Sequence, residues 1–348
     1  MSGRCDIGGA SREREMTGSR AGVAESSAGV AGSRAGVAGP RGSAAGLRAG
    51  VDIGATKTLT VLRDERDAVL GEAMAPTPAR RGGEAILDTA AGLVRDLLAS
   101  ADAEPGDLAG VGVGAAGVIS GAGVVTAAGG SFTGWVGTDI DLGLSSRLGG
   151  VRVHSANDVK AFLLAELAEL GPDRPGQALA VAVGTGVGGA LLVDGQLLLG
   201  GGAGAGEIGH IGDFGDEPCS CGRHGHVEAY AGGWALARRY TAATGRHWTT
   251  ARVAEAARSG DPVATALFEQ AGACLGEAIG HTCGLLGIDL VILGGGLLRA
   301  WTLLERPLLD SLQQHPPLSC GPVQVRLTQL GDRAVALGAA GLVPLRSA

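Results

Sequence analysis

The sequence contains few aromatic residues, few cysteines and no long uninterrupted apolar run. Four Phe, four Trp and two Tyr occur among 348 residues, so a hydrophobic core has to be built from Ala, Val, Leu, Ile and Gly. Six unevenly spaced cysteines do not make a disulfide framework and fit a reducing cytoplasm better. The uncharged run from Pro175 to Val193 is interrupted by five glycines and is therefore not expected to cross a membrane. These absences predict a soluble, cytoplasmic protein without a membrane partner.

The first 47 residues differ in composition from the rest of the chain. Ser-Arg-Ala-Gly-Val-Ala occurs at 19–24 and again at 33–38, among Gly, Ala and Ser and without helical or strand periodicity. This composition predicts a disordered low-complexity tail over residues 1–47. The tail contains neither the apolar stretch of a signal peptide nor the two amphipathic helices of a helix-turn-helix domain.

Because the tail lacks residues that could form a core, we expect it to be dispensable. A chain that begins near Ala45 should match the full-length protein in melting temperature and in activity. Differential scanning calorimetry and a rate assay on both chains test this prediction. A clear loss of either property on truncation would mean that the tail packs against the folded part.

Length and charge limit what the remaining chain can be. The tail holds six Arg and four acidic residues, a net charge of +2, which leaves −9 for the rest of a chain whose total is −7. An acidic body argues against nucleic acid as a partner. A chain of 348 residues is too long for one ordinary core and long enough for two domains.

Two glycine-rich turns follow directly after apolar, strand-like runs. The first is Val51-Asp52-Ile53-Gly54-Ala55-Thr56-Lys57-Thr58 and the second is Val183-Gly184-Thr185-Gly186-Val187-Gly188-Gly189. Small residues let the backbone approach a ligand closely, and their N–H groups can surround a phosphate. Each turn leads into a second strand and a tight reversal. The repeated unit suggests two related domains that hold one nucleotide, which favours phosphoryl transfer.

Strands and helices alternate between and after these turns. Apolar residues at helical spacing predict a helix around Ile86–Leu98, and the run Leu108–Val118 that follows predicts a buried strand. A later helix is expected over Pro262–Leu286, followed by the strand Asp289–Leu293 and the turn Gly294–Gly296, and a final helix over about Asp332–Leu345. The pattern is that of an α/β protein.

A second candidate for chemistry is the segment Asn157-Asp158, which lies between the strand Val151–Val153 and an apolar helix. This places Asp158 in the first turn of the helix, where free N–H groups and the helix dipole favour a carboxylate. Such a carboxylate can act as the general base for an alcohol. Taken alone, however, the segment is explained better by helix capping.

The segment from Gly206 to Glu228 contains several possible metal ligands. Cys219 and Cys221, with His226 five residues on and His210 nine residues before the first cysteine, could form a closed tetrahedral zinc site. His224 is a competing fourth ligand. The alternative is a pair of free thiols in a polar loop.

These motifs together resemble the ROK family of sugar kinases and sugar-responsive repressors. The motifs are Asp-Ile-Gly-x-Thr-Lys, Asn-Asp-Val, Gly-Thr-Gly-Val-Gly-Gly, Glu-Ile-Gly-His and Cys-x-Cys-Gly-x-x-Gly-x-x-Glu, in this order, over residues 47–345. Within the family, the bacterial glucokinases are most similar. The resemblance implies an actin-like, hexokinase-type ATPase fold with a sugar and ATP cleft between two domains. It implies a small domain over 48–162, on which the C-terminal helix 333–348 packs, and a larger domain over 163–332 that carries the zinc loop.

The resemblance also implies roles for individual residues in an ATP-dependent sugar kinase. Asp158 matches the catalytic base, and Asp52 matches the residue that faces Mg²⁺. The sugar-binding positions correspond to Asn157, Asp158, Glu207, His210 and Glu228. The ATP-binding positions correspond to Asp52, Gly54, Thr56, Lys57, Thr185, Gly186, Gly294, Gly295 and Gly296. The ligands of a structural Zn²⁺ correspond to His210, Cys219, Cys221 and His226. The resemblance further implies a homo-oligomer, either a dimer or a tetramer.

Three positions depart from the family pattern. Position 226, usually Cys, is His here; position 55, usually Gly, is Ala; and Ser131 stands where many members have Asn. The change at Ser131, in a segment that borders the sugar cleft, bears on which sugar is used. Glucose is the first expectation, and N-acetylmannosamine, N-acetylglucosamine, allose or fructose are alternatives, as is polyphosphate in place of ATP. A non-catalytic ROK regulator is the remaining alternative, against which the intact Asn157-Asp158 and the structureless tail argue.

Overall fold

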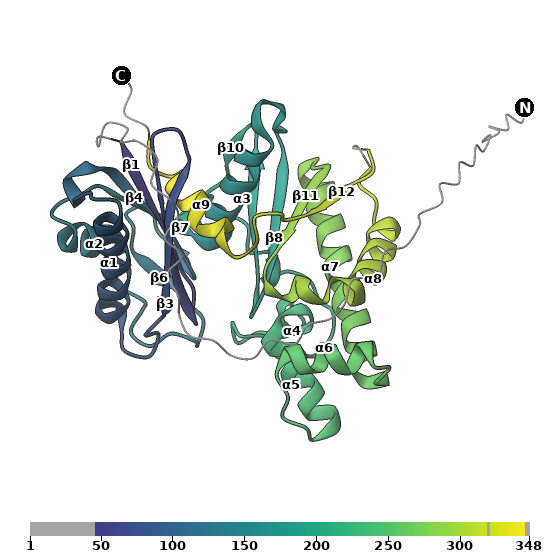
Figure 1. Cartoon of the computed structure of the whole chain (residues 1–348). Coiled ribbons are helices and arrows are strands. Elements are labelled where there is room, and N and C mark those ends of the chain that lie inside the picture. Colours follow the sequence, from purple (N-terminus) through teal and green to yellow (C-terminus); the bar gives the residue numbers. More distant parts are fainter. Residues whose placement is uncertain (1–45, 319–320, 345–348) are drawn as a thin grey trace, which may run out of the picture. The chain divides into compact units, whose positions relative to one another are not determined.

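The computed structural model of the chain describes residues 46–318 and 321–344 (Figure 1). The predictions made for the tail up to residue 45 and for residues 345–348 of the C-terminal helix lie outside these ranges. Cys5 and Cys320 lie outside them as well. All statements below concern the described residues.

The first sheet has five strands. In spatial order they are β3 (Val69–Pro76), β2 (Lys57–Arg63), β1 (Leu47–Ile53), β4 (Leu108–Ala115) and β7 (Val153–Asn157). β1 pairs antiparallel with β2 and parallel with β4. Nearly every residue of β1, β2 and β4 is buried, because helices cover both faces of the sheet. Helices α1 (Gly83–Ser100) and α2 (Ile140–Arg147) lie beside one face, and α9 (Ala334–Ala340) packs against β1 and β4 (Figure 1).

The second sheet repeats this arrangement. Its strands are β10 (Gln196–Leu197), β9 (Val187–Val193), β8 (Ala178–Val183), β11 (Leu290–Gly294) and β12 (Gln324–Leu327). As with β1, the strand β8 pairs antiparallel with the strand after the glycine turn and parallel with a later strand. The prediction of a strand, turn and strand unit that occurs twice is therefore confirmed. A short pair, β5 (Val118–Ile119) and β6 (Val125–Ala127), completes the strands.

Alternate residues of β8 contribute to two different hydrophobic clusters. Ala178 and Ala180 pack with α3 (Asp158–Glu169), whereas Leu179 and Val181 face the cluster formed by the helices on the other side. This is the period-two burial expected of a strand covered on both faces. Those helices are α4 (Glu228–Ala231), α5 (Gly233–Thr244), α6 (Thr250–Arg258), α7 (Pro262–Leu286) and α8 (Trp301–Gln314).

Helix α7 has the bounds that its sequence predicts. The side chain of Asp261 accepts a hydrogen bond from Ala264 N at 2.9 Å, and Pro262 occupies the first helical position. Gly287 ends the helix in the left-handed conformation, with φ of 66°. In residues 46–318 and 321–344, no helix is both long and apolar enough to cross a membrane.

Helix α9 approaches the first sheet and α3 so closely that only glycines fit at the contacts. A Cβ atom on Gly112 of β4 would overlap the carbonyl oxygen of Ala339, and one on Gly338 would overlap that of Ala161. Backbone atoms cannot rotate out of such a contact as side chains can. The glycines therefore determine how closely α9 packs against the first sheet and α3.

We expect Gly112→Ala to lower the free energy of unfolding by at least about 2 kcal/mol, because the methyl group forces α9 away from the sheet. Gly92→Ala on α1 is the matched control, since a Cβ there meets no atom within 4 Å. That change should stabilise the protein by about 0.5–1 kcal/mol. Urea denaturation of both variants makes the comparison. Equal stabilities would show that α9 is not held by this contact.

Candidate active site

Asn157 and Asp158 lie where β7 ends and α3 begins. Asn157 is the N-cap residue, and its Oδ1 accepts hydrogen bonds from Val159 N at 3.0 Å and from Lys160 N at 3.4 Å. Its Nδ2 donates to Asp158 Oδ1 at 2.9 Å and to Gly117 O at 3.0 Å. The capping role thus belongs to Asn157. Asp158 is held in a fixed orientation beside it, which is what a general base requires.

Two carboxyl groups influence each other at this point, the buried Asp52 and the partly buried Asp158. Burial raises the pKa of Asp158 to about 6; the negative charge of Glu207 adds to the rise, and hydrogen bonds from Val159 and Asn157 oppose it. Burial raises the pKa of Asp52, which is 9% exposed, to about 7; Asp158 adds to this rise and Lys57 opposes it. A carboxylate that titrates near neutrality is well matched to proton transfer. A divalent cation beside Asp52 would favour its charged form, so this residue fits the predicted Mg²⁺ position.

Glu207 and His210 flank the same region. His210 Nε2 lies 4.0 Å from Glu207 Oε2, at the two ends of the short 3₁₀ turn Ile208–His210. Lys160 is only 3% exposed, and its ammonium group donates a hydrogen bond to Ala203 O. Burial lowers the pKa of Lys160, and the negative charge of Glu207 opposes this fall. Lys160 was not predicted as a site residue, although a lysine two residues after Asp158, directly before the apolar run Ala161–Ala165, was a usable signal.

Glu228 connects three segments rather than standing free. It is 8% exposed, and its Oε2 accepts a hydrogen bond from Val187 N, just after the second glycine turn, at 3.0 Å. Its Oε1 accepts from the hydroxyl of Ser220 and from Trp234 Nε1, the latter at 3.3 Å. A Cβ on Gly186 would overlap Glu228 Oε2, so the glycine at position 186 leaves room for this carboxylate. Glu228 therefore ties the cysteine loop to the second turn, a link that the sequence did not indicate.

The glycine turns themselves are closed by backbone hydrogen bonds. Gly54 N donates to Lys57 O at 3.1 Å, and Gly184 N donates to Gly186 O at 2.9 Å. Lys57 Nζ lies 2.7 Å from Oδ2 of Asp332, a residue in the turn directly before α9. Thr56 is exposed. This lysine is therefore placed beside the first turn by a partner 275 residues away in the chain.

The predicted adenosine segment Gly294–Gly296 contacts both the second turn and α3. Gly295 has φ of 95°, and a Cβ there would overlap Val183 O, directly before the turn that contains Thr185. A Cβ on Gly294 would lie 2.5 Å from the ring of Phe162, one turn along the helix from Asp158. The structure thus brings this segment next to elements that carry the other predicted residues. Ala55 is partly exposed in the first turn, and Ser131 is exposed.

Four predicted metal ligands form one cluster. Cys219 Sγ lies 3.5 Å from His210 Nδ1, and Cys221 Sγ lies 3.3 Å from His226 Nδ1. All four ligand atoms lie within 4.8 Å of one another, and exposed His224 is not among them. Tetrahedral zinc with ordinary bond lengths separates nitrogen and sulfur ligands by about 3.6 Å. Burial lowers the pKa of His226, which favours the neutral, zinc-binding form. The donor set and the spacing therefore fit zinc.

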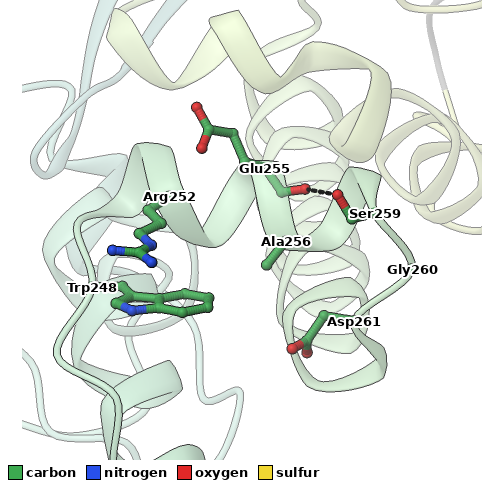
Figure 2. A pocket seen from close by; sticks show the side chains of 7 residues that line it. All are labelled: Trp248, Arg252, Glu255, Ala256, Ser259, Gly260 and Asp261. Carbon is green, nitrogen blue, oxygen red and sulfur yellow. Dashed lines mark hydrogen bonds between the residues drawn. The ribbon is translucent and has the colours of Figure 1, made fainter.

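A hollow of about 490 Å³ lies apart from these predicted residues. Figure 2 shows its lining, from Trp248 across α6 to the start of α7. The guanidinium carbon of Arg252 lies 4.4 Å from the centre of the Trp248 ring, as in a cation–π contact. No residue predicted from the sequence lines this hollow, so we do not assign it to the active site.

The fold and the arrangement of these residues define the class of protein. Two sheets that repeat a strand, turn and strand unit, with glycine turns and a carboxylate at a helix start, are those of an actin-like, hexokinase-type ATPase fold. The ROK family matches residues 48–346. The chain belongs to the ROK family.

Individual relatives agree with this assignment. The glucokinase of Halalkalibacterium halodurans is 28% identical over 319 residues, which cover 84% of this chain and 94% of the relative. The N-acetyl-D-glucosamine kinase of Shigella boydii is 29% identical and covers 84% of this chain and 98% of its own. The structure of a ROK family glucokinase from Streptomyces griseus in complex with glucose and AMPPNP is 28% identical, with a TM-score of 0.72, and covers 86% and 99% of the two chains. The chain is accordingly a sugar kinase, a phosphotransferase of the hexokinase type.

Proposed function

We propose that this kinase transfers the γ-phosphate of ATP to the 6-hydroxyl of a hexose, and that the hexose is glucose. The observation that carries the proposal is Asp158, held at the start of α3 by Asn157, with a pKa raised to about 6. The glucokinases among the relatives, one of them solved with glucose and AMPPNP, support glucose as the sugar. The proposed location of this reaction is the cytoplasm.

In the proposed reaction Asp158 accepts the proton of the sugar hydroxyl. The hydroxyl oxygen forms a bond to the γ-phosphorus while the bond from that phosphorus to the β,γ-bridging oxygen breaks, and ADP leaves. Near and above neutral pH, Asp158 is ionised and ready to take the proton, because its pKa of about 6 lies below the working pH. The remaining parts of the site supply positioning and charge, as in other phosphoryl transfer enzymes.

We assign the phosphates of ATP to the two glycine turns, to Thr56 and to Lys57, and the adenosine to Gly294–Gly296. Gly54 in the first turn, and Thr185 and Gly186 in the second, offer backbone N–H groups that could surround a phosphate. Asp52 would hold Mg²⁺, which would neutralise charge on the transferred phosphoryl group.

We assign the sugar hydroxyls to Asn157, Glu207, His210 and Glu228. Carboxylates and amides suit a polyol, which offers both donors and acceptors at fixed angles. His210 can serve two purposes at once, because its Nε2 faces Glu207 while its Nδ1 faces Cys219. A zinc ion on Nδ1 would fix the ring so that Nε2–H points to the sugar.

A second candidate function is the phosphorylation of an N-acetylhexosamine. The observation in its favour is the N-acetyl-D-glucosamine kinase at 29% identity over most of both chains. Ser131, whose side chain is exposed in the segment before Trp135, is the departure that bears on this choice.

A coupled assay of ADP formation with ATP and Mg²⁺ over a panel of sugars tests the proposal. The panel contains glucose, fructose, allose, N-acetylglucosamine and N-acetylmannosamine, and polyphosphate replaces ATP in a parallel series. We expect the highest kcat/KM for glucose with ATP. A higher kcat/KM for an N-acetylhexosamine than for glucose would favour the second candidate function. No turnover of any sugar would point to a non-catalytic regulator.

A further inference from the structure

Three side chains outside the active site converge at the end of the α7–α8 pair. Glu277 and His281 lie one turn apart on α7 and therefore on one face of that helix. His315 follows directly after the last residue of α8. One ligand atom from each residue lies within 4.8 Å of the other two. The two imidazole rings are packed edge to face, with centroids 5.2 Å apart.

A hydrogen bond fixes which nitrogen of His315 is free. Its Nδ1 lies 2.8 Å from Ser311 O. Because a carbonyl oxygen can only accept a hydrogen bond, Nδ1 must carry a proton, and in the neutral imidazole Nε2 then keeps its lone pair. Metal-binding histidines are usually oriented by such a bond from the other ring nitrogen.

Packing between the helices holds His315 in place independently of any ion. Gly272, Gly276 and Gly280 form a groove along α7 that faces α8. A Cβ on Gly280 would lie 2.6 Å from His315 O and 3.0 Å from His315 Cβ, so only glycine lets His315 come this close. One helical turn earlier, Ser311 Oγ donates to Ala273 O at 2.8 Å. The three candidate ligands are therefore positioned by the backbone of two packed helices.

We propose that Glu277, His281 and His315 form a second metal site, distinct from the cysteine loop, for a divalent cation of the zinc type. Two imidazoles and one carboxylate suit Zn²⁺, Ni²⁺ or Cu²⁺, whereas Mg²⁺ and Ca²⁺ prefer sets of oxygen ligands. Three protein ligands leave the fourth position to water. Since the side chain of His281 is exposed, the ion exchanges with solvent. A bound ion would join the end of α8 to α7.

Zinc titration by calorimetry tests the site in the full-length protein. The protein is first dialysed against a chelating resin that removes weakly bound metal and leaves the cysteine loop loaded. We expect wild type to take up one additional Zn²⁺ per chain. His281→Ala and Glu277→Gln should weaken this uptake at least about tenfold. His247→Ala, which removes an exposed histidine elsewhere, is the matched control and should bind as wild type does.

Two further readouts separate this site from the cysteine loop. Co²⁺ bound here should lack the thiolate charge-transfer absorption that cobalt shows at cysteine ligands. Zn²⁺ should raise the melting temperature of wild type and of His247→Ala but not that of His281→Ala. Because the side chain of His281 is exposed, its loss should leave the fold intact, as the unchanged melting temperature without added zinc would show. Equal zinc uptake by His281→Ala and His247→Ala, or no additional uptake by wild type, would overturn the proposal.

Discussion

Asp158→Asn is expected to lower kcat by at least about 10²-fold while the protein stays folded. Asparagine keeps the shape of the side chain and can still accept the hydrogen bonds from Val159 N and Asn157 Nδ2. It cannot take a proton from the sugar. Steady-state rates with saturating sugar and ATP measure the effect, and circular dichroism checks the fold. A variant that kept more than about a tenth of the wild-type kcat would refute the assigned role.

Glu166→Gln is the matched control for this variant. Glu166 lies on the same helix, is 8% exposed, and burial raises its pKa, as burial does for Asp158. Its carboxylate accepts a hydrogen bond from Thr328 rather than facing the other predicted site residues. We expect its kcat to change by no more than a few-fold. A similar loss in both variants would indicate damage to α3 instead of loss of a base.

The pH profile gives a second test of the same residue. A base whose pKa is raised to about 6 is protonated below that pH, so wild-type kcat/KM should fall as the pH falls through 6. With saturating Mg²⁺, which favours the charged form of Asp52, kcat/KM should no longer change with pH above pH 7, where Asp158 is ionised. In Asp158→Asn, kcat/KM for the small residual reaction should no longer fall as the pH falls through 6. A wild-type profile that stayed flat down to pH 5 would exclude Asp158 as the titrating base.

The second large effect is expected at the cysteine loop. His226→Cys should keep one tightly bound zinc per chain after dialysis against chelating resin, since thiolate and imidazole both suit tetrahedral zinc. His226→Ala combined with His224→Ala should lose it; the second change prevents His224 from replacing the missing ligand. The double variant should lose at least about 3 kcal/mol of stability. The KM for the sugar should rise, because Glu228 is bonded to Ser220 within this loop.

Metal analysis and urea denaturation measure these outcomes. The variant His224→Ala alone is the control and should retain both the zinc and the stability, since exposed His224 lies outside the ligand cluster. No tightly bound metal in wild type would remove the structural role from all four predicted ligands. Zinc retained by the double variant would show that His226 is not a ligand.

Much of the fold was predictable because it depends on local patterns. The helix Pro262–Leu286 has a capping residue, a first-turn proline and a terminal glycine within its own sequence. The strands on either side of the second glycine turn, Ala178–Val183 and Val187–Val193, are continuous apolar runs, as expected for strands buried on both faces. The predicted final helix was too long, since the structure forms α9 only over Ala334–Ala340 and has a 3₁₀ turn at Gly331–Arg333 before it. The boundaries of the two proposed domains remain predictions.

The interactions missed in the site join residues that are distant in the chain. Lys57 pairs with Asp332 across 275 positions, and Glu228 bonds to Val187 across 41. Neither pairing leaves a periodic signal, because each depends on how the sheets and helices are packed. The same is true of His315, which reaches His281 only through the glycine groove of α7. The order of the motifs predicted which residues belong to the site, whereas the contacts of these residues required the structure.

The most direct test of the account is to identify the product formed from ATP, Mg²⁺ and glucose. Phosphorus NMR of the reaction mixture follows ATP, ADP and any sugar phosphate together. We predict that glucose 6-phosphate and ADP accumulate in equal amounts with wild type, at a rate at least about 10² times that with Asp158→Asn. Release of ADP and inorganic phosphate without a sugar phosphate, or no consumption of ATP with any sugar of the panel, would contradict the proposed reaction.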